Sequence, residues 1–102
     1  MKVIDVVSSV RSKNAGPFWV TIDIFCGSVP AFNRIVAGLT TRQVGDALGQ
    51  PEAAVKRFDI ASLHVVKFSV HRPVVQGHPA DRDLHGAQWA VLIEELVLPD
   101  QQ

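Results

Sequence analysis

The sequence predicts an α+β sandwich, in which an antiparallel sheet of about four strands carries two helices on one face. Two observations favour this class. Segments typical of half-buried strands stand towards both ends of the chain, and the middle carries two patterns that cap helices. Because strands precede and follow the helices, a ferredoxin-like layout with the helix pair on one side of the sheet is compatible with this order.

The first part of the chain predicts two strands joined by a loop. The β-branched residues from Val3 to Val10 favour a strand, and the polar, glycine-containing stretch 11–17 favours a loop. Apolar side chains then alternate along a second strand, from Phe18 to Phe25. Its other face mixes aromatic residues with Thr21 and Asp23, so we expect that face to be half covered. The apolar face would consist of Phe18, Val20, Ile22 and Ile24.

Two helices are predicted next. A helix over 28–38 is favoured because a serine can cap it, a proline fits its first turn and a glycine can end it. Thr40 and Gln43 have the spacing of a capping box, which predicts a second, short helix that ends at Gly49. The segment 51–55 is expected to add one more helical turn.

The remainder predicts two further strands. The dense apolar run 58–75 favours a long strand that bends near Ser62. The segment 76–86 contains glycines, a proline and charges without periodicity, which predicts the longest loop. A final strand is expected over 89–98, because β-branched residues and Pro99 outweigh a pair of helix-favouring glutamates.

Composition limits the classes of function. The chain has 102 residues and a mass of 11.1 kDa, which fits a single domain over 1–102 with little interior for an enclosed cofactor, so none is expected. Ten Lys and Arg balance ten Asp and Glu, so no basic face for nucleic acid is indicated. The single cysteine fits a reducing cytoplasm, and no apolar run reaches the ~18 residues of a membrane span.

The stretch 11–17 is the first candidate site. It concentrates two cations, a hydroxyl, a carboxamide and a glycine, which can surround a carboxylate or phosphate with donors. The alternative is a solvated turn whose polar residues only satisfy their own backbone. Asp23 either faces solvent or lies under this loop, paired with Arg11 or Lys13.

A second candidate lies at 81–88, where His85 with Asp83 or Asp81 can form a proton-transfer pair. The alternative is an Asp-rich turn. Arg72 can reach the same anion as the first site or a partner surface. Four histidines recur every seven residues, but prolines and glycines interrupt any helix that would align them, so no metal site is expected.

Two further residue types have competing interpretations. Cys26 precedes a predicted helix, whose dipole would lower the thiol pKa, although a small buried residue is the favoured interpretation. Trp19 and Trp89 are interpreted as packing or interface residues.

The motif at 11–18 also carries a resemblance. The chain resembles small bacterial proteins that are encoded beside members of the acyclic-terpene-utilisation protein A (AtuA-like) family. These small proteins are themselves similar to the C-terminal domain of the larger AtuA-like proteins. The resemblance covers nearly the whole chain, although Gln88 stands near a position where the larger proteins have lysine. It implies a ferredoxin-like small subunit that pairs with a large AtuA-like subunit in a pathway of hydroxy acids, acyl-thioesters or related carboxylates. Its motifs are Arg11-Ser12-Lys13-Asn14-Ala15-Gly16-Pro17-Phe18, Thr21-x-Asp23-Ile24, Arg72-Pro73 and Asp83-x-x-Gly86-Ala87-Gln88.

Residues and resemblance together give two hypotheses. The first is the small subunit of a two-component enzyme, a hydratase or dehydratase-type lyase. The second is a non-catalytic binding or scaffolding module, homo-oligomeric or attached to a large subunit, with Trp19, Phe25 and Trp89 as contact residues. Under the first, catalytic roles are expected for Lys13, Asp83 and His85. Substrate binding is expected for Arg11, Ser12, Asn14, Gly16, Arg72 and Gln88.

Overall fold

The fold is seen in a computed structural model that describes residues 1–16, 18–71 and 89–99. The described strands are β1 (Ser9–Asn14), β2 (Trp19–Phe25), β3 (Val55–Ile60) and β4 (Val65–His71). The described helices are α1 (Val3–Val6), α2 (Val29–Gly38), α3 (Thr41–Leu48) and α4 (Trp89–Glu94), with short 3₁₀ turns η1 (Glu52–Ala54) and η2 (Ala61–Leu63).

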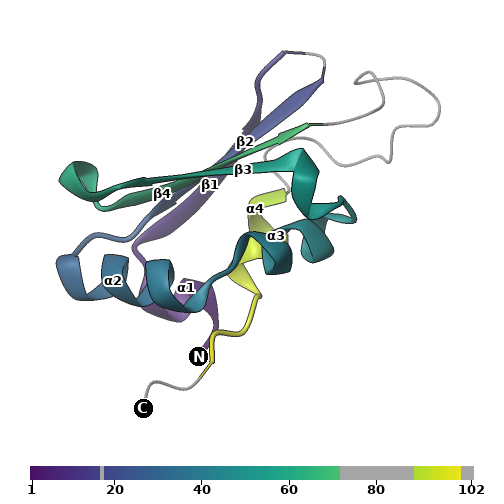
Figure 1. Ribbon diagram of the computed structural model, residues 1–102. Coiled ribbons are helices and arrows are strands. Elements are labelled where there is room, and N and C mark those ends of the chain that lie inside the picture. The colour runs from purple at the N-terminus through teal and green to yellow at the C-terminus, as the bar shows by residue number, and fades with distance from the viewer. Residues whose placement is uncertain (17, 72–88, 100–102) are drawn as a thin grey trace.

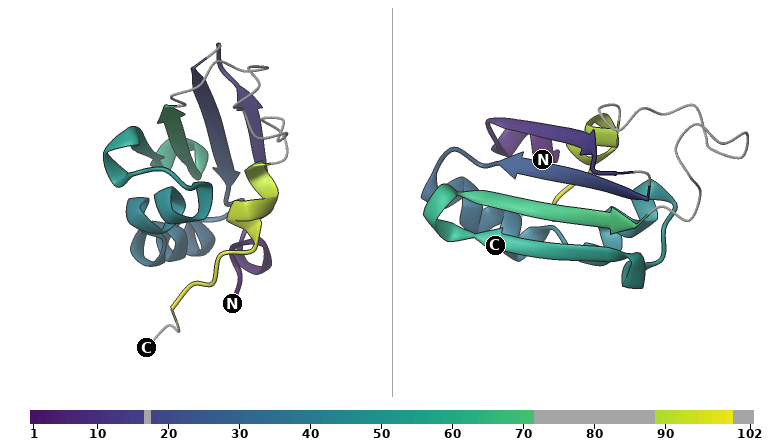
Figure 2. Two further views of the ribbon diagram at one scale, coloured as in Figure 1. Left: turned by 90° about the vertical axis from the view of Figure 1, so that its right-hand side faces the viewer. Right: turned by 90° about the horizontal axis from the view of Figure 1, so that it is seen from above.

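The four strands form one antiparallel sheet in the order β1-β2-β4-β3. Two hairpins, β1–β2 and β3–β4, lie side by side, so β2 and β4 are the central strands (Figure 2). The helices lie on one face of this sheet and leave its other face open (Figure 1). The predicted α+β sandwich, with an antiparallel sheet and a helix pair on one face, is confirmed.

The core lies between the sheet and the helices. The central strands form its sheet side, since alternate residues of β2 and β4 point towards the helices and are fully buried. The helices close it from the other side with Ile35 of α2, Val44 of α3 and Ile93 of α4. The buried strand residues are Val20, Ile22, Ile24, Val66, Phe68 and Val70.

The two predicted central helices are confirmed with their caps. Ser28 Oγ accepts a hydrogen bond from the N–H of Ala31 at 3.2 Å, and Thr40 forms the reciprocal capping box with Gln43. Gly45 is a weak helix former, yet it is buried within α3. A side chain would not fit there, because the carbonyl oxygen of Gln50 lies 2.8 Å from where a Cβ would stand.

The prediction for the start of the chain is wrong. A strand was expected over 3–10, whereas Val3–Val6 form a helical turn and the strand runs from Ser9 to Asn14. The carboxylate of Asp5 accepts a hydrogen bond from the Lys2 N–H at 3.0 Å, which fixes the turn, and Val3 packs fully buried. The stretch predicted as a loop is therefore mostly strand, since an edge strand tolerates charged residues on its solvent side.

The expected final strand is also wrong, because Trp89–Glu94 form the helix α4 and the rest of the segment contributes only an isolated bridge between Val97 and Lys2. Trp89, Ala90 and Ile93 are buried, whereas Val91 and Leu92 are exposed. This spacing is helical and not alternating.

The long apolar run contains a reversal and not a bend. Strands β3 and β4 pair antiparallel on either side of η2, and His64, with a φ of 54°, adopts the left-handed conformation that ends this turn. The turn expected at 51–55 is present as η1. Residues 72–75 of the predicted strand and the predicted loop at 76–86 lie outside the described residues.

Candidate functional site

The candidate site is the open face of the sheet, which receives part of the predicted anion-binding stretch. Burial alternates along β1, so Arg11 and Lys13 project from the open face while Ser12 and Asn14 lie on the helix side. Both predicted cations therefore lie on one face of the sheet, and their role in binding an anion stays a prediction. The predicted loop geometry, in which all four side chains converge, is contradicted because a strand sends neighbouring residues to opposite faces.

Ser12 has a structural position. Its Oγ accepts a buried hydrogen bond from the Ala90 N–H at 2.8 Å, which connects β1 to the first turn of α4. Gly16 lies in the turn between β1 and β2, where its φ of 81° favours glycine, and the Ala15 N–H donates to the carbonyl of Trp19 at 2.8 Å. The other predicted site residues lie outside the described residues: Arg72, Asp83, His85 and Gln88.

Strand register places four cations around one carboxylate on the open face. Asp23 of β2 stands between Arg11 of β1 and Lys67 of β4, and Lys13 and Lys56 occupy the next row across the sheet. Within the part of the chain that the structure describes, the ion pairs are Lys2–Glu95 and Arg57–Asp59, so none of these open-face charges is paired. The expected pairing of Asp23 with Arg11 or Lys13 is therefore absent there.

Aromatic side chains accompany these cations. Phe18, Phe25 and Phe58 are 42%, 38% and 49% exposed, which makes the face amphipathic. Phe18 was expected on the buried face of β2, but it precedes the strand and stacks on His71 at 6.3 Å between ring centroids. The half-buried Trp19 has the ammonium of Lys56 over its ring at 5.5 Å.

Trp89 does not belong to this face. It is only 7% exposed and starts α4 in the core, so it is a packing residue and not a contact residue of the open surface. Sequence reasoning missed Lys56, Lys67 and Phe58 as members of the face, because only the strand order brings them beside β2.

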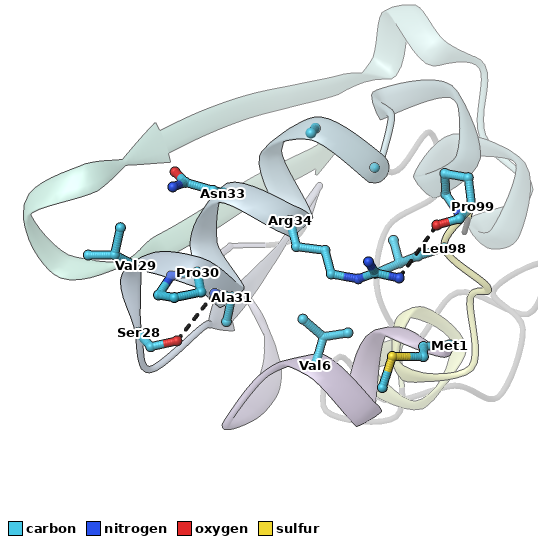
Figure 3. Close-up of a pocket in the computed structure, with 12 residues that line it drawn as sticks. Met1, Val6, Ser28, Val29, Pro30, Ala31, Asn33, Arg34, Leu98 and Pro99 are labelled. Atoms are coloured by element: carbon cyan, nitrogen blue, oxygen red, sulfur yellow. Dashed lines mark hydrogen bonds between the residues drawn. The ribbon is translucent and has the colours of Figure 1, made fainter. Parts of the chain in front are cut away.

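A groove of ≈ 940 Å³ lies on the helix side of the molecule, between α1, α2 and the segment after α4 (Figure 3). Its lining is mainly apolar, from Met1 and Val6 to Leu98. Arg34 extends across it and donates a hydrogen bond to the carbonyl oxygen of Pro99 at 3.5 Å. Residues from both ends of the chain form the groove, so no local sequence pattern indicates it.

Cys26 is not an activated nucleophile. Burial, followed by the nearby negative charge of Asp59, raises the pKa of the thiol to about 11 from 9.0. The side chain is only 3% exposed, and desolvation outweighs the dipole of α2 that was considered from sequence. At neutral pH the residue is therefore a protonated core thiol.

This shift predicts a pH dependence of stability. Because the folded-state pKa is raised, the unfolded chain ionises Cys26 first as the pH rises above about 9, and the free energy of unfolding should fall by about 2 kcal/mol by pH 11. Urea unfolding of the wild type and Cys26→Ala between pH 7 and 11 measures this contribution. An alkaline slope that is the same in both proteins would contradict it.

The described residues offer neither a metal site nor a membrane span. They contain no group of three or more His, Cys, Asp and Glu side chains arranged to hold a metal ion. None of the helices in ranges 1–16, 18–71 and 89–99 is long and apolar enough to cross a membrane.

The fold and the open face define a small α+β domain with one sheet face covered by helices and one left amphipathic and rich in cations. The chain belongs to the family described as a domain of unknown function, DUF4387, whose model matches residues 3–96. No curated protein and no solved structure matches the chain.

Proposed function

We propose that this protein is the small subunit of a cytoplasmic two-component enzyme and binds a large AtuA-like subunit through the open face of its sheet. The observation that carries the proposal is the combination on one sheet face of three exposed phenylalanines with four cations that have no ion-pair partner among the described residues. Aromatic residues and Arg are enriched at the energetic centres of protein interfaces. The helix side of the sheet is buried in the core, whereas the open face offers a sheet surface for contact with the large subunit.

Charge complementarity favours an acidic partner over a second copy of this chain. The whole chain has a net charge of zero, yet its open face presents four cations and one carboxylate. Two such faces placed together would bring like charges into contact, which costs several kcal/mol at an interface. An acidic surface on the large subunit avoids this cost and speeds encounter.

The reaction class we propose is that of a hydratase or dehydratase-type lyase on a carboxylate or acyl-thioester. Arg11 and Lys13 stand on the face that the large subunit would cover, where exclusion of water strengthens their attraction for a substrate carboxylate or a developing enolate. Proton transfer by Asp83 or His85 belongs to the same proposal.

The assembly is tested by co-expressing the tagged chain with a large AtuA-like protein, the partner that the proposal names, and measuring the mass of the purified complex. We expect a stoichiometric complex with the wild type and at least about a tenfold loss of affinity when Lys13 and Lys67 are both changed to Glu. The matched control is Arg42→Glu on α3, an exposed charge reversal away from the open face, which should assemble normally. A wild type that purifies only with itself, or a double variant that binds as well as the control, would refute the proposal.

A non-catalytic scaffolding module is the second candidate. It is favoured because Ser12 and Asn14 lie on the helix side of β1, so they do not join Arg11 and Lys13 in one binding site. The purified complex separates the two functions. If the small subunit contributes to catalysis, Arg11→Ala or Lys13→Ala should abolish lyase activity while assembly survives. Unchanged activity in both variants would assign a scaffolding role.

A further inference from the structure

One row of the open face combines two hydroxyls with two lysines. Register places Lys13 of β1 opposite Thr21 of β2, Thr21 opposite Ser69 of β4, and Ser69 opposite Lys56 of β3. The two hydroxyl residues therefore belong to the central strands and the two lysines to the edge strands, in the strand order that Figure 2 shows. We call these four residues the hydroxyl row.

Thr21 is the unusual member of the hydroxyl row. It is 9% exposed, and its Oγ1 is shielded from solvent with no hydrogen-bond partner among the described residues. A buried polar group without a partner is unfavourable, and nearly all such groups in proteins are satisfied. None of the described helices covers this sheet face, so a ligand atom is the partner that would satisfy this hydroxyl.

The charges of the hydroxyl row specify the ligand. Lys13 has no ion-pair partner in the described ranges, and Lys56 is held over the ring of Trp19 by a cation–π contact and not by a carboxylate. In the strand register Lys13 and Lys56 therefore stand on either side of the two hydroxyl residues, and Arg11 and Lys67 add positive charge in the adjacent row. Such a set of donors is complementary to an oxyanion.

We propose that the hydroxyl row is a binding site for the oxyanion of a small molecule, a carboxylate or a phosphate, with Thr21 and Ser69 donating hydrogen bonds and Lys13 and Lys56 supplying charge. The site deepens the proposed function and rests on it for its role, because a partner that covers the open face would enclose this ligand between the subunits. Its residues all belong to this chain. Binding is therefore measurable without the partner.

The test is titration of the isolated chain with inorganic phosphate and with acetate at constant ionic strength, followed by the amide NMR shifts of β1, β2 and β4. We expect saturable shifts at the hydroxyl row with at least one of the two anions. Thr21→Val and Lys13→Gln should each weaken binding by about tenfold or more, as loss of one hydrogen bond to a charged group implies. Arg42→Gln, which removes a cation from α3, is the matched control and should bind like the wild type.

Thermal unfolding adds a second readout. If the Thr21 hydroxyl has no ligand, Thr21→Val should raise the Tm by the same amount with and without anion, because the variant removes an unsatisfied buried hydroxyl. If it binds an oxyanion, the anion should raise the Tm of the wild type but not that of Thr21→Val. Saturation by acetate alone assigns a carboxylate, and saturation by phosphate alone assigns a phosphate.

The proposal is overturned if neither anion saturates the wild type, or if Thr21→Val binds as tightly as the wild type. Either result leaves assembly with the large subunit untouched, since the co-purification test uses no anion. Conversely, a chain that binds the anion but no partner would remove the subunit role and keep the site.

Discussion

Replacing Arg57 by Met should lower the free energy of unfolding by about 3 kcal/mol, because its guanidinium ties the end of α2 to the sheet. Arg57 lies on the helix side of β3 and donates to the carbonyls of Val36, at 3.1 Å, and Leu39. Val36 lies in the last turn of α2 and Leu39 is its C-cap, so their carbonyls have no partner within the helix. Asp59 orients the guanidinium by accepting from its Nε at 2.8 Å.

Urea unfolding with matched variants tests this effect of Arg57. Arg57→Met keeps the apolar stem, so the change isolates the polar contacts. Arg57→Lys keeps the charge but loses the planar fork that reaches two carbonyls, and should recover only part of the stability. Arg42→Met on the exposed side of α3 is the control and should change stability by less than about 0.5 kcal/mol. The expectation fails if Arg57→Met falls in the range of this control.

Local signals account for the parts of the fold that the sequence predicted. The helices α2 and α3 are marked by caps at Ser28 and Thr40, and each cap is satisfied within three residues along the chain. Strand β2 is marked by its own alternation. Because these signals involve residues close together in the sequence, they can be recognised without knowledge of the tertiary structure.

The ends of the chain could not be predicted in this way. β-Branched residues around Val3 favour a strand locally, but a hydrogen bond from its N–H to the carbonyl of Leu96, at 2.8 Å, holds them in the helix layer. The first turn of α4 likewise depends on Ser12, which precedes Ala90 by 78 residues. Partners so distant along the chain override local propensity.

The same contrast between local and long-range signals applies to the residues of the candidate site. Arg11 and Lys13 were identified because two cations stand close together in the sequence, whereas Lys56 and Ser69 joined them only through strand order. The predicted loop misplaced Ser12, because a period of two sends it to the face opposite its neighbours. The sequence shows which residue types stand close together at 11–14, but the face that each of these side chains takes follows only once the segment is known to be a strand.

The second large effect is expected at Phe68, at the centre of the core. Its side chain is fully buried on the central strand β4, so Phe68→Ala should cost about 3 to 5 kcal/mol through lost burial and the cavity left behind. This is a large part of the stability of a domain of this size, about 5 to 15 kcal/mol. Phe68→Leu leaves less empty volume and should keep the protein folded at room temperature, which circular dichroism and urea unfolding can measure.

Phe68 and Arg57 should not act independently, because the Cζ of Arg57 lies 5.8 Å from the centroid of the Phe68 ring. The ring supports the guanidinium that binds the end of α2, so loss of either member already removes part of the other's contribution. The double variant Arg57→Met, Phe68→Leu should therefore lose about 0.5 to 1 kcal/mol less than the two single variants together. Additive losses would mean that the carbonyls of α2 and Asp59 alone hold the guanidinium, and that the ring contributes only its buried area.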